Sequence, residues 1–178
     1  MHHELILILD FGSQYTQLIA RRVREQGVYC EIARFDLPIE EIVSRRPKGV
    51  ILSGGPSSVY EEGAPRVGPD FYEKIGVPVL GICYGMGLIA ADLGGRSEPA
   101  ARREYGHAQL KVLSGSTRLF NELPFELDVW MSHGDHVTEL PPGFRTTATT
   151  GEAITAMENE SRGFYCVQFH PEVSHTPL

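Results

Sequence analysis

VPVLGICYGMGLIAADLGG, residues 77–95, combines a strand, a tight turn and a helix in immediate succession. Residues 77–82 are almost wholly apolar, which is typical of a buried strand. Residues 86–93 have the composition of a helix, and Gly94 and Gly95 end it. A buried strand followed at once by a helix is the repeating unit of a parallel sheet. The segment therefore predicts an α/β fold.

The same alternation precedes this segment. Further strands are expected over residues 5–9, 28–33 and 49–52. Helices are expected over residues 14–26 and 39–44, where apolar side chains recur at helical spacing. This series predicts a doubly wound, mostly parallel sheet with flanking helices.

The chain changes character after Gly95. Shorter runs, separated by Gly, Pro and Asn turns, occupy residues 108–113, 127–131, 146–150 and 154–157. They predict a smaller antiparallel addition. A last strong strand, residues 164–169, leads directly into His170. We expect one globular domain over residues 1–178, which is either a fragment or the front part of a longer protein because no closing helix follows.

Composition excludes several classes of protein. No segment approaches the ~20 apolar residues that span a bilayer, and the amino terminus lacks the cationic stretch of a signal peptide. A net charge of −7 opposes nonspecific binding to nucleic acid phosphates. The three cysteines fit neither a disulfide framework nor a zinc site. We therefore expect a cytoplasmic protein with reduced thiols and a small-molecule substrate.

Cys83 lies in a Gly-x-Cys-x-Gly turn between the predicted strand and helix. In a comparable G-x-S-x-G elbow, the tight turn presents a nucleophile, and the glycines relieve crowding. The amino-terminal end of the following helix also favours thiolate over thiol. The plainer reading is a buried cysteine at a close crossing of helix and strand.

His170 and Glu172 flank Pro171, which disfavours helix at the residue before it. In an extended segment, side chains two positions apart point the same way, so both can face one site. A carboxylate beside an imidazole fixes its tautomer, and the imidazole can exchange a proton with a thiol. The alternative is a loop histidine paired with a surface glutamate.

Two further loops can contribute to a site. Ser53-Gly54-Gly55-Pro56 follows a strand at the sheet edge where α/β proteins bind ligands, so its N–H groups, with that of Tyr84, can form an oxyanion hole. A plain turn is the alternative. The segment from Ser132 to His136 is expected either to line the pocket or to be a polar turn. A metal site formed by this segment with His170, Glu172 and His175 matches no metal-binding signature.

Three motifs together resemble class I (triad) glutamine amidotransferases. They are the Cys83 elbow, Ser53-Gly-Gly-Pro and Phe169-His-Pro-Glu-Val. Asp10–Glu25, Val129–Asp135 and Val167–Val173 resemble the amidotransferase domain of glutamine-hydrolysing GMP synthetases in particular. The resemblance covers essentially the whole chain, and it implies a flavodoxin-like fold.

The resemblance implies hydrolysis of glutamine to glutamate and ammonia through a thioester. Cys83 would be the nucleophile, His170 the general base and acid, and Glu172 the residue that orients His170. Gly55 and Tyr84 would supply the oxyanion hole. The residues expected near the amino-acid end of glutamine are Ser132, Gly134 and Asp135.

The family also implies a partner. Ammonia would pass to a synthetase (ATP-pyrophosphatase) domain or subunit, which uses ATP and magnesium to convert XMP to GMP. No pyrophosphatase-type loop such as Ser-Gly-Gly-Val-Asp-Ser occurs in the chain. We therefore expect no cofactor, metal, nucleic acid or membrane partner for this chain itself.

Gly87 departs from the family pattern. The elbow is usually followed by Gly-Met-Gln, whereas this chain has Gly85-Met86-Gly87. The resemblance implies that the glutamine helps to hold the substrate, so weaker or altered substrate binding is expected here. Cys166, a second departure, is expected to pack in the core.

Three alternatives remain at the level of sequence. The domain is a weakly active or inactive module that regulates or docks to a partner; it serves another amidotransferase, such as one for anthranilate or carbamoyl phosphate; or it is a cysteine hydrolase for a different amide. The helix that begins Phe11-Gly12-Ser13-Gln14-Tyr15 argues against the second alternative.

Overall fold

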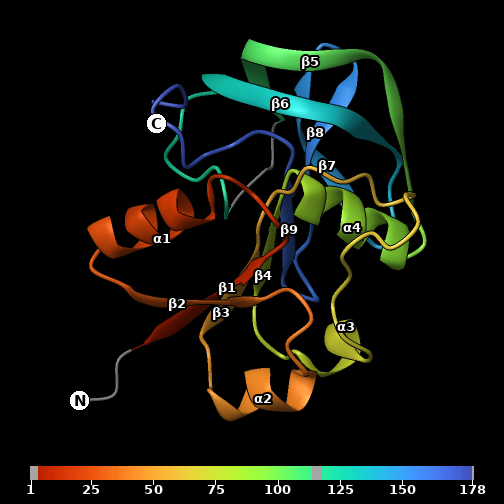
Figure 1. Ribbon diagram of the computed structural model, residues 1–178. Coiled ribbons are helices and arrows are strands. Elements are labelled where there is room, and N and C mark those ends of the chain that lie inside the picture. The colour runs from red at the N-terminus through yellow and green to blue at the C-terminus, as the bar shows by residue number, and fades with distance from the viewer. Residues whose placement is uncertain (1–3, 114–117, 178) are drawn as a thin grey trace.

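The computed structural model describes residues 4–113 and 118–177, and one large sheet dominates it (Figure 1). Within these ranges the strands are β1 (Leu5–Asp10), β2 (Tyr29–Arg34), β3 (Gly49–Leu52), β4 (Val79–Ile82), β5 (Arg96–Val112), β6 (Glu126–Glu139), β7 (Arg145–Thr150), β8 (Ala153–Asn159) and β9 (Phe164–Val167). The helices are α1 (Thr16–Glu25), α2 (Ile39–Ser44), α3 (Phe71–Lys74) and α4 (Tyr84–Asp92). The strand order is β2-β1-β3-β4-β9-β8-β6-β5-β7.

The first half of the sheet is parallel. β1 pairs with β2 and β3, β3 with β4, and β4 with β9. These strands are short and apolar because helices cover both faces, as expected for a parallel sheet. The predicted α/β class, with helices that flank parallel strands, is confirmed.

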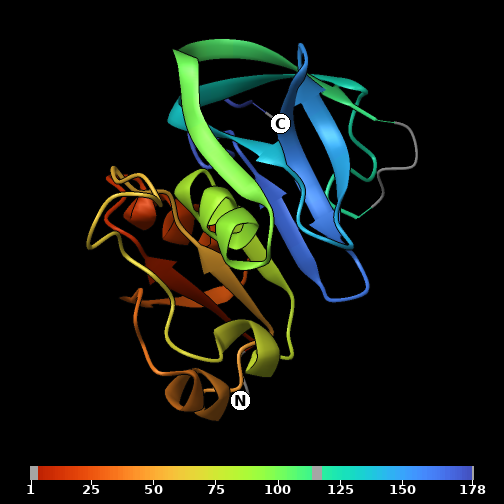
Figure 2. The ribbon, with the colours of Figure 1, turned by 90° about the vertical axis from the view of Figure 1, so that its right-hand side faces the viewer.

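Side chains that alternate along the parallel strands separate two cores. Leu7 and Leu9 of β1 belong to one buried cluster, which includes side chains of α2, α3 and α4. Ile8, between them, belongs to the other cluster, which includes side chains of α1. This follows from the two-residue period of a strand. Figure 2 shows the two halves of the sheet from a second direction.

The antiparallel half is larger than predicted. Antiparallel pairings outnumber parallel ones by five to four among the described residues. β5 and β6, with 17 and 14 residues, are longer than any parallel strand. The prediction of a mostly parallel sheet with a smaller antiparallel addition is therefore not confirmed in detail. The polar first part of β5 has no apolar alternation, and its strand state depends on pairing with β6.

Two of the cysteines are structural. Cys30 and Cys166 are 1% and 0% exposed, and neither forms a disulfide. The expected core position of Cys166 is confirmed, and burial raises the pKa of its thiol. No helix in the described part of the chain has the length and apolar character needed to cross a membrane.

Candidate active site

Cys83 lies at the junction of β4 and α4 with a strained backbone. Its φ of 53° and ψ of −104° are unusual for a residue with a side chain. A Cβ at Gly85 would lie 2.6 Å from the Leu52 carbonyl oxygen, and one at Gly81 would lie 2.8 Å from the Gly85 carbonyl carbon. Both glycines are therefore required by close packing, as predicted for an elbow. The Cys83 N–H donates to the Val167 carbonyl at 2.8 Å, which ties the turn to β9.

His170 and Glu172 follow β9, and their side chains meet. His170 Nδ1 lies 2.7 Å from Glu172 Oε1, and the two side chains are only 5% and 3% exposed. The plainer reading, a surface glutamate beside a loop histidine, does not fit this burial. Glu172 Oε2 has no hydrogen-bond partner within the described ranges. The whole interaction of this carboxylate is therefore directed at the imidazole.

Backbone contacts fix the loop that carries His170. The His170 N–H donates to the Trp130 carbonyl at 3.1 Å, and the Thr176 hydroxyl donates to the His170 carbonyl at 2.8 Å. Thr176 Oγ1 also accepts from the Trp130 N–H at 3.0 Å. On the other side, Arg22 Nε of α1 donates to the Glu172 carbonyl at 2.9 Å. The imidazole therefore has little freedom to move away from Cys83.

Cys83 and Glu172 act together on the charge of His170. Burial disfavours the imidazolium, but hydrogen bonds to Cys83 and Glu172 and the negative charges of both groups outweigh burial and raise the pKa of His170 to about 10. The imidazole therefore holds a proton at neutral pH. This arrangement suits a thiolate and imidazolium pair, which can attack a carbonyl carbon and then protonate a leaving amine.

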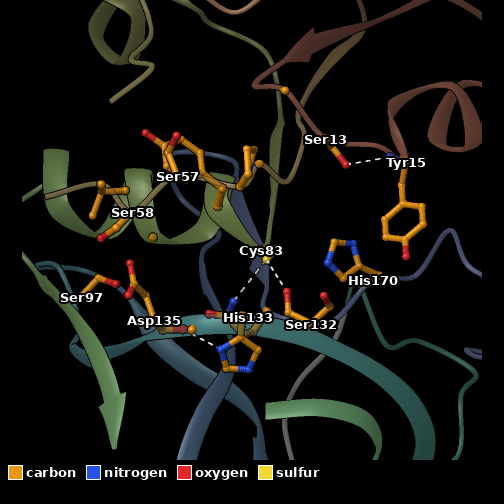
Figure 3. Close-up of a pocket in the computed structure, with 18 of the residues that line it drawn as sticks. Ser13, Tyr15, Ser57, Ser58, Cys83, Ser97, Ser132, His133, Asp135 and His170 are labelled. Carbon is orange, nitrogen blue, oxygen red and sulfur yellow. Dashed lines mark hydrogen bonds between the residues drawn. The ribbon is translucent and has the colours of Figure 1, made fainter. Parts of the chain in front are cut away.

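A cavity of about 530 Å³ opens over Cys83, at the carboxyl edge of β3 and β4 (Figure 3). Gly55 and Tyr84, the two predicted oxyanion-hole residues, both line it. A Cβ at Gly54 would lie 3.2 Å from His170 Cε1 and 3.5 Å from Cys83 Cβ. The Gly54-Gly55 backbone is therefore next to the reacting groups, as an oxyanion hole requires. The role of these N–H groups stays a prediction.

Ser132, Gly134 and Asp135 also line the cavity. The prediction of a loop or turn here is wrong, because all three residues lie within β6, where Ser132 and Asp135 pair with β5. The Cys83 thiol contacts the Ser132 carbonyl oxygen at 3.6 Å. His133 Nδ1 is 2.6 Å from the Asp135 carbonyl oxygen. This part of β6 thus forms a wall of the pocket, although its side-chain roles remain predictions.

The residues of the alternative metal site make other side-chain contacts in the structure. The His175 ring packs on Trp130 with 4.5 Å between centroids, while His170 contacts Glu172. No group of three or more potential ligands is placed for a metal ion within residues 4–113 and 118–177.

Two pocket residues were missed as site residues by the sequence analysis. The Gln168 side-chain amide donates to Cys83 Sγ at 3.7 Å. Tyr15, which lies at the start of the helix predicted over residues 14–26, contacts the His170 ring edge-on with 5.3 Å between centroids. Gln168 lies two residues before His170, and its polarity inside an otherwise apolar strand pattern was an available signal. No local signal identifies Tyr15.

Gly87 lies on α4, one turn after Cys83, and lines the same cavity. A Cβ at this position would lie 3.5 Å from Ser97 Oγ and 3.7 Å from Val59 Cγ1, which are ordinary contacts. The space therefore accepts a side chain, unlike that at Gly81 and Gly85.

Comparison with known proteins gives one family. The model of the family "Glutamine amidotransferase class-I" matches residues 7–178. The chain is 56% identical to the GMP synthase [glutamine-hydrolyzing] of Mannheimia succiniciproducens, over 99% of the chain and 35% of that protein. It is 54% identical to the enzyme of the same name from Pediococcus pentosaceus, over 96% of the chain and 33% of that protein. The chain thus spans about a third of the length of these relatives.

Solved structures agree. A protein from Thermoplasma acidophilum described as one subunit of a GMP synthase is 32% identical with a TM-score of 0.84, over 99% of this chain and 88% of that one. A glutamine amidotransferase from Thermotoga maritima is 24% identical with a TM-score of 0.75, over 97% of this chain and 78% of that one, which supports the fold alone.

Proposed function

Because the chain belongs to the class-I glutamine amidotransferase family, we propose that it hydrolyses the side-chain amide of glutamine, with Cys83 as the nucleophile. One observation carries the proposal. The thiol of a strained elbow lines the same cavity as His170, whose Nδ1 lies 2.7 Å from the buried Glu172. We also infer that the parallel half of the sheet is the doubly wound, flavodoxin-like core of the family.

In the first step, Cys83 Sγ attacks the amide carbon and a C–S bond forms. Negative charge develops on the carbonyl oxygen, and in this proposal the N–H groups of Gly55 and Tyr84, two residues of the cavity lining, stabilise it. His170 then gives its proton to the amide nitrogen as the C–N bond breaks, and ammonia leaves. A glutamyl thioester remains on Cys83.

In the second step, His170 accepts a proton from water, and the oxygen attacks the thioester carbon. The C–S bond breaks and glutamate leaves. Cys83 is then a thiolate again, and His170, which keeps the proton from water, is an imidazolium again. Glu172 stabilises the imidazolium in both steps through the contact with Nδ1. At the other end of the substrate, Asp135 supplies a negative charge for the amino group, and Ser132 and Gly134 form the wall beside it.

The ammonia is destined for a synthetase domain or subunit that makes GMP from XMP with ATP and magnesium. This part of the proposal depends on relatives named GMP synthase [glutamine-hydrolyzing], of which the chain spans about a third. The proposed setting is the cytoplasm. ATP and magnesium belong to the synthetase, and the chemistry proposed for this chain uses no cofactor.

Release of ammonia from glutamine tests the proposal. Purified chain should release ammonia and glutamate in equal amounts, and Cys83→Ala should abolish release. A diazo-ketone analogue of glutamine should label Cys83 covalently, as a mass increase on one peptide. An active Cys83→Ala variant, or an unlabelled Cys83, would refute the proposal.

A weakly active regulatory or docking module is the second candidate, favoured by Gly87 in the pocket wall. Ammonia release measured with and without a GMP synthetase separates the two. A rate that stays at background with the synthetase present would favour the module.

A further inference from the structure

Ser97 is a buried polar residue at the start of β5, on the wall of the active-site cavity. It is 1% exposed, and its N–H donates to the Tyr60 hydroxyl at 2.8 Å. Its own hydroxyl makes no hydrogen bond within the described part of the chain. This oxygen is not among the fully buried polar atoms that lack a partner in the described residues, so it reaches the cavity that Ser97 lines. This hydroxyl therefore has unused hydrogen-bonding capacity beside the pocket.

Gly87 leaves this hydroxyl uncovered. A Cβ at Gly87 would be 3.5 Å from Ser97 Oγ, so any side chain there would stand against it. Packing does not demand glycine at this position, because the contacts of that Cβ are ordinary and its φ is not positive. Glycine is also unfavourable inside a helix such as α4. What glycine provides here is access to Ser97 from the cavity.

The position of Ser97 indicates which part of a ligand it meets. Figure 3 places Ser97 and Asp135 on one side of Cys83, and His170 and Tyr15 on the other. In the β5–β6 ladder, Ser97 pairs with Val137 and Pro99 with Asp135, so Ser97 and Asp135 share a face. A hydroxyl beside a carboxylate favours a cationic, hydrogen-donating group.

We propose that Ser97 is a substrate-binding residue: its hydroxyl, left open by Gly87, accepts a hydrogen bond from the α-ammonium group of glutamine next to Asp135. This inference rests on the proposed function and adds to it the residue that recognises the free amino-acid end. Cys83 and His170 act on the amide, whereas Ser97 acts only on binding.

A double-mutant cycle of Ser97→Ala, Gly87→Ala and the double variant tests the inference. Ser97→Ala should raise the KM for glutamine about 10-fold or more, the size expected for one hydrogen bond to a charged group, while kcat changes by less than about two-fold. Gly87→Ala should raise KM similarly by covering the hydroxyl, although it favours the helix and should raise Tm. The double variant should be no worse than either single variant, because both remove the same contact.

A substrate without the amino group gives a second readout. The amide of glutaric acid lacks the α-ammonium, so Ser97→Ala should leave its KM unchanged. Gly68→Ala is the control, because Gly68 has no positive φ and its Cβ would meet nothing closer than 3.7 Å, away from the cavity.

Different experimental results would refute the proposed function and this inference. A wild-type chain that neither releases ammonia nor labels at Cys83 refutes the proposed function and this inference with it. An active chain whose KM is unaffected by Ser97→Ala, or whose variants have additive effects, overturns the inference alone. If Ser97→Ala does not fold, an unchanged KM in Gly87→Ala overturns it.

Discussion

Replacement of Glu172 by Gln removes a charge from the site with little change in shape. The carboxylate contacts His170 Nδ1 at 2.7 Å and is 3% exposed, so solvent screens this interaction little. A hydrogen bond to a charged group contributes about 1.5 to 3 kcal/mol, which corresponds to about a 10- to 150-fold loss. We expect kcat/KM for glutamine to fall by a factor in that range.

The same change should move the pH profile. In the wild type, the pKa of His170 is raised to about 10, in part by the negative charge of Glu172. Without that charge the pKa of His170 falls, so the imidazolium that protonates the leaving ammonia is lost at lower pH. The alkaline limb of kcat/KM should therefore shift toward neutrality in Glu172→Gln. Initial rates of glutamate formation, measured on both sides of the wild-type limb, give this shift directly.

Glu158→Gln provides the matched control. Glu158 of β8 is an equally buried glutamate, 3% exposed. Its Oε1 accepts a hydrogen bond from Arg145 Nε of β7 at 3.0 Å. Its replacement should change stability but leave the alkaline limb in place. If Glu172→Gln keeps both the wild-type limb and the wild-type kcat/KM, then Glu172 does not act through His170, and the reasoning fails.

Three other changes test the pocket and the elbow. Gly87→Gln covers the Ser97 hydroxyl as Gly87→Ala does but adds an amide to the cavity, so its KM for glutamine should fall below that of Gly87→Ala by a factor equivalent to about 1 to 3 kcal/mol; a KM equal to that of Gly87→Ala would refute this. Cys83→Gly should be inactive yet more stable than Cys83→Ala by about 1 kcal/mol, because glycine relieves the strain of a φ of 53°; calorimetry showing the reverse order would contradict it. Gly85→Ala should lower the free energy of unfolding by about 1 to 3 kcal/mol through a clash with Leu52, and denaturant melts in which it matches the wild type would count against the close packing.

Local signals were sufficient for the parallel half of the sheet and for the elbow. The bounds of α2 (Ile39–Ser44) and β3 (Gly49–Leu52) agree with the prediction, because short apolar runs end there at turn residues. The elbow at Cys83 was predicted because its two glycines lie at fixed positions around the nucleophile, and the structure shows why both are needed.

Pairing between segments that are distant in the sequence explains the structural features that were not predicted. Ser132 and Asp135 are strand residues only because β6 pairs with β5 across a shift in register. The contact between Gly87 and Ser97 joins a helix to a strand that passes over it, and neither residue carries a pattern that indicates the other. This region is polar because it lines the pocket. A rule based on apolar alternation therefore does not detect its strands.

The burial of Cys30 and Cys166 has a practical consequence for measurement. Only Cys83 faces the cavity, while the other two thiols are closed off by the core. A thiol reagent small enough to enter should therefore modify one site in the native chain and all three cysteines after unfolding. The chain thus carries its own reporter of conformation, and the number of modified thiols at each denaturant concentration measures how much of the core has opened.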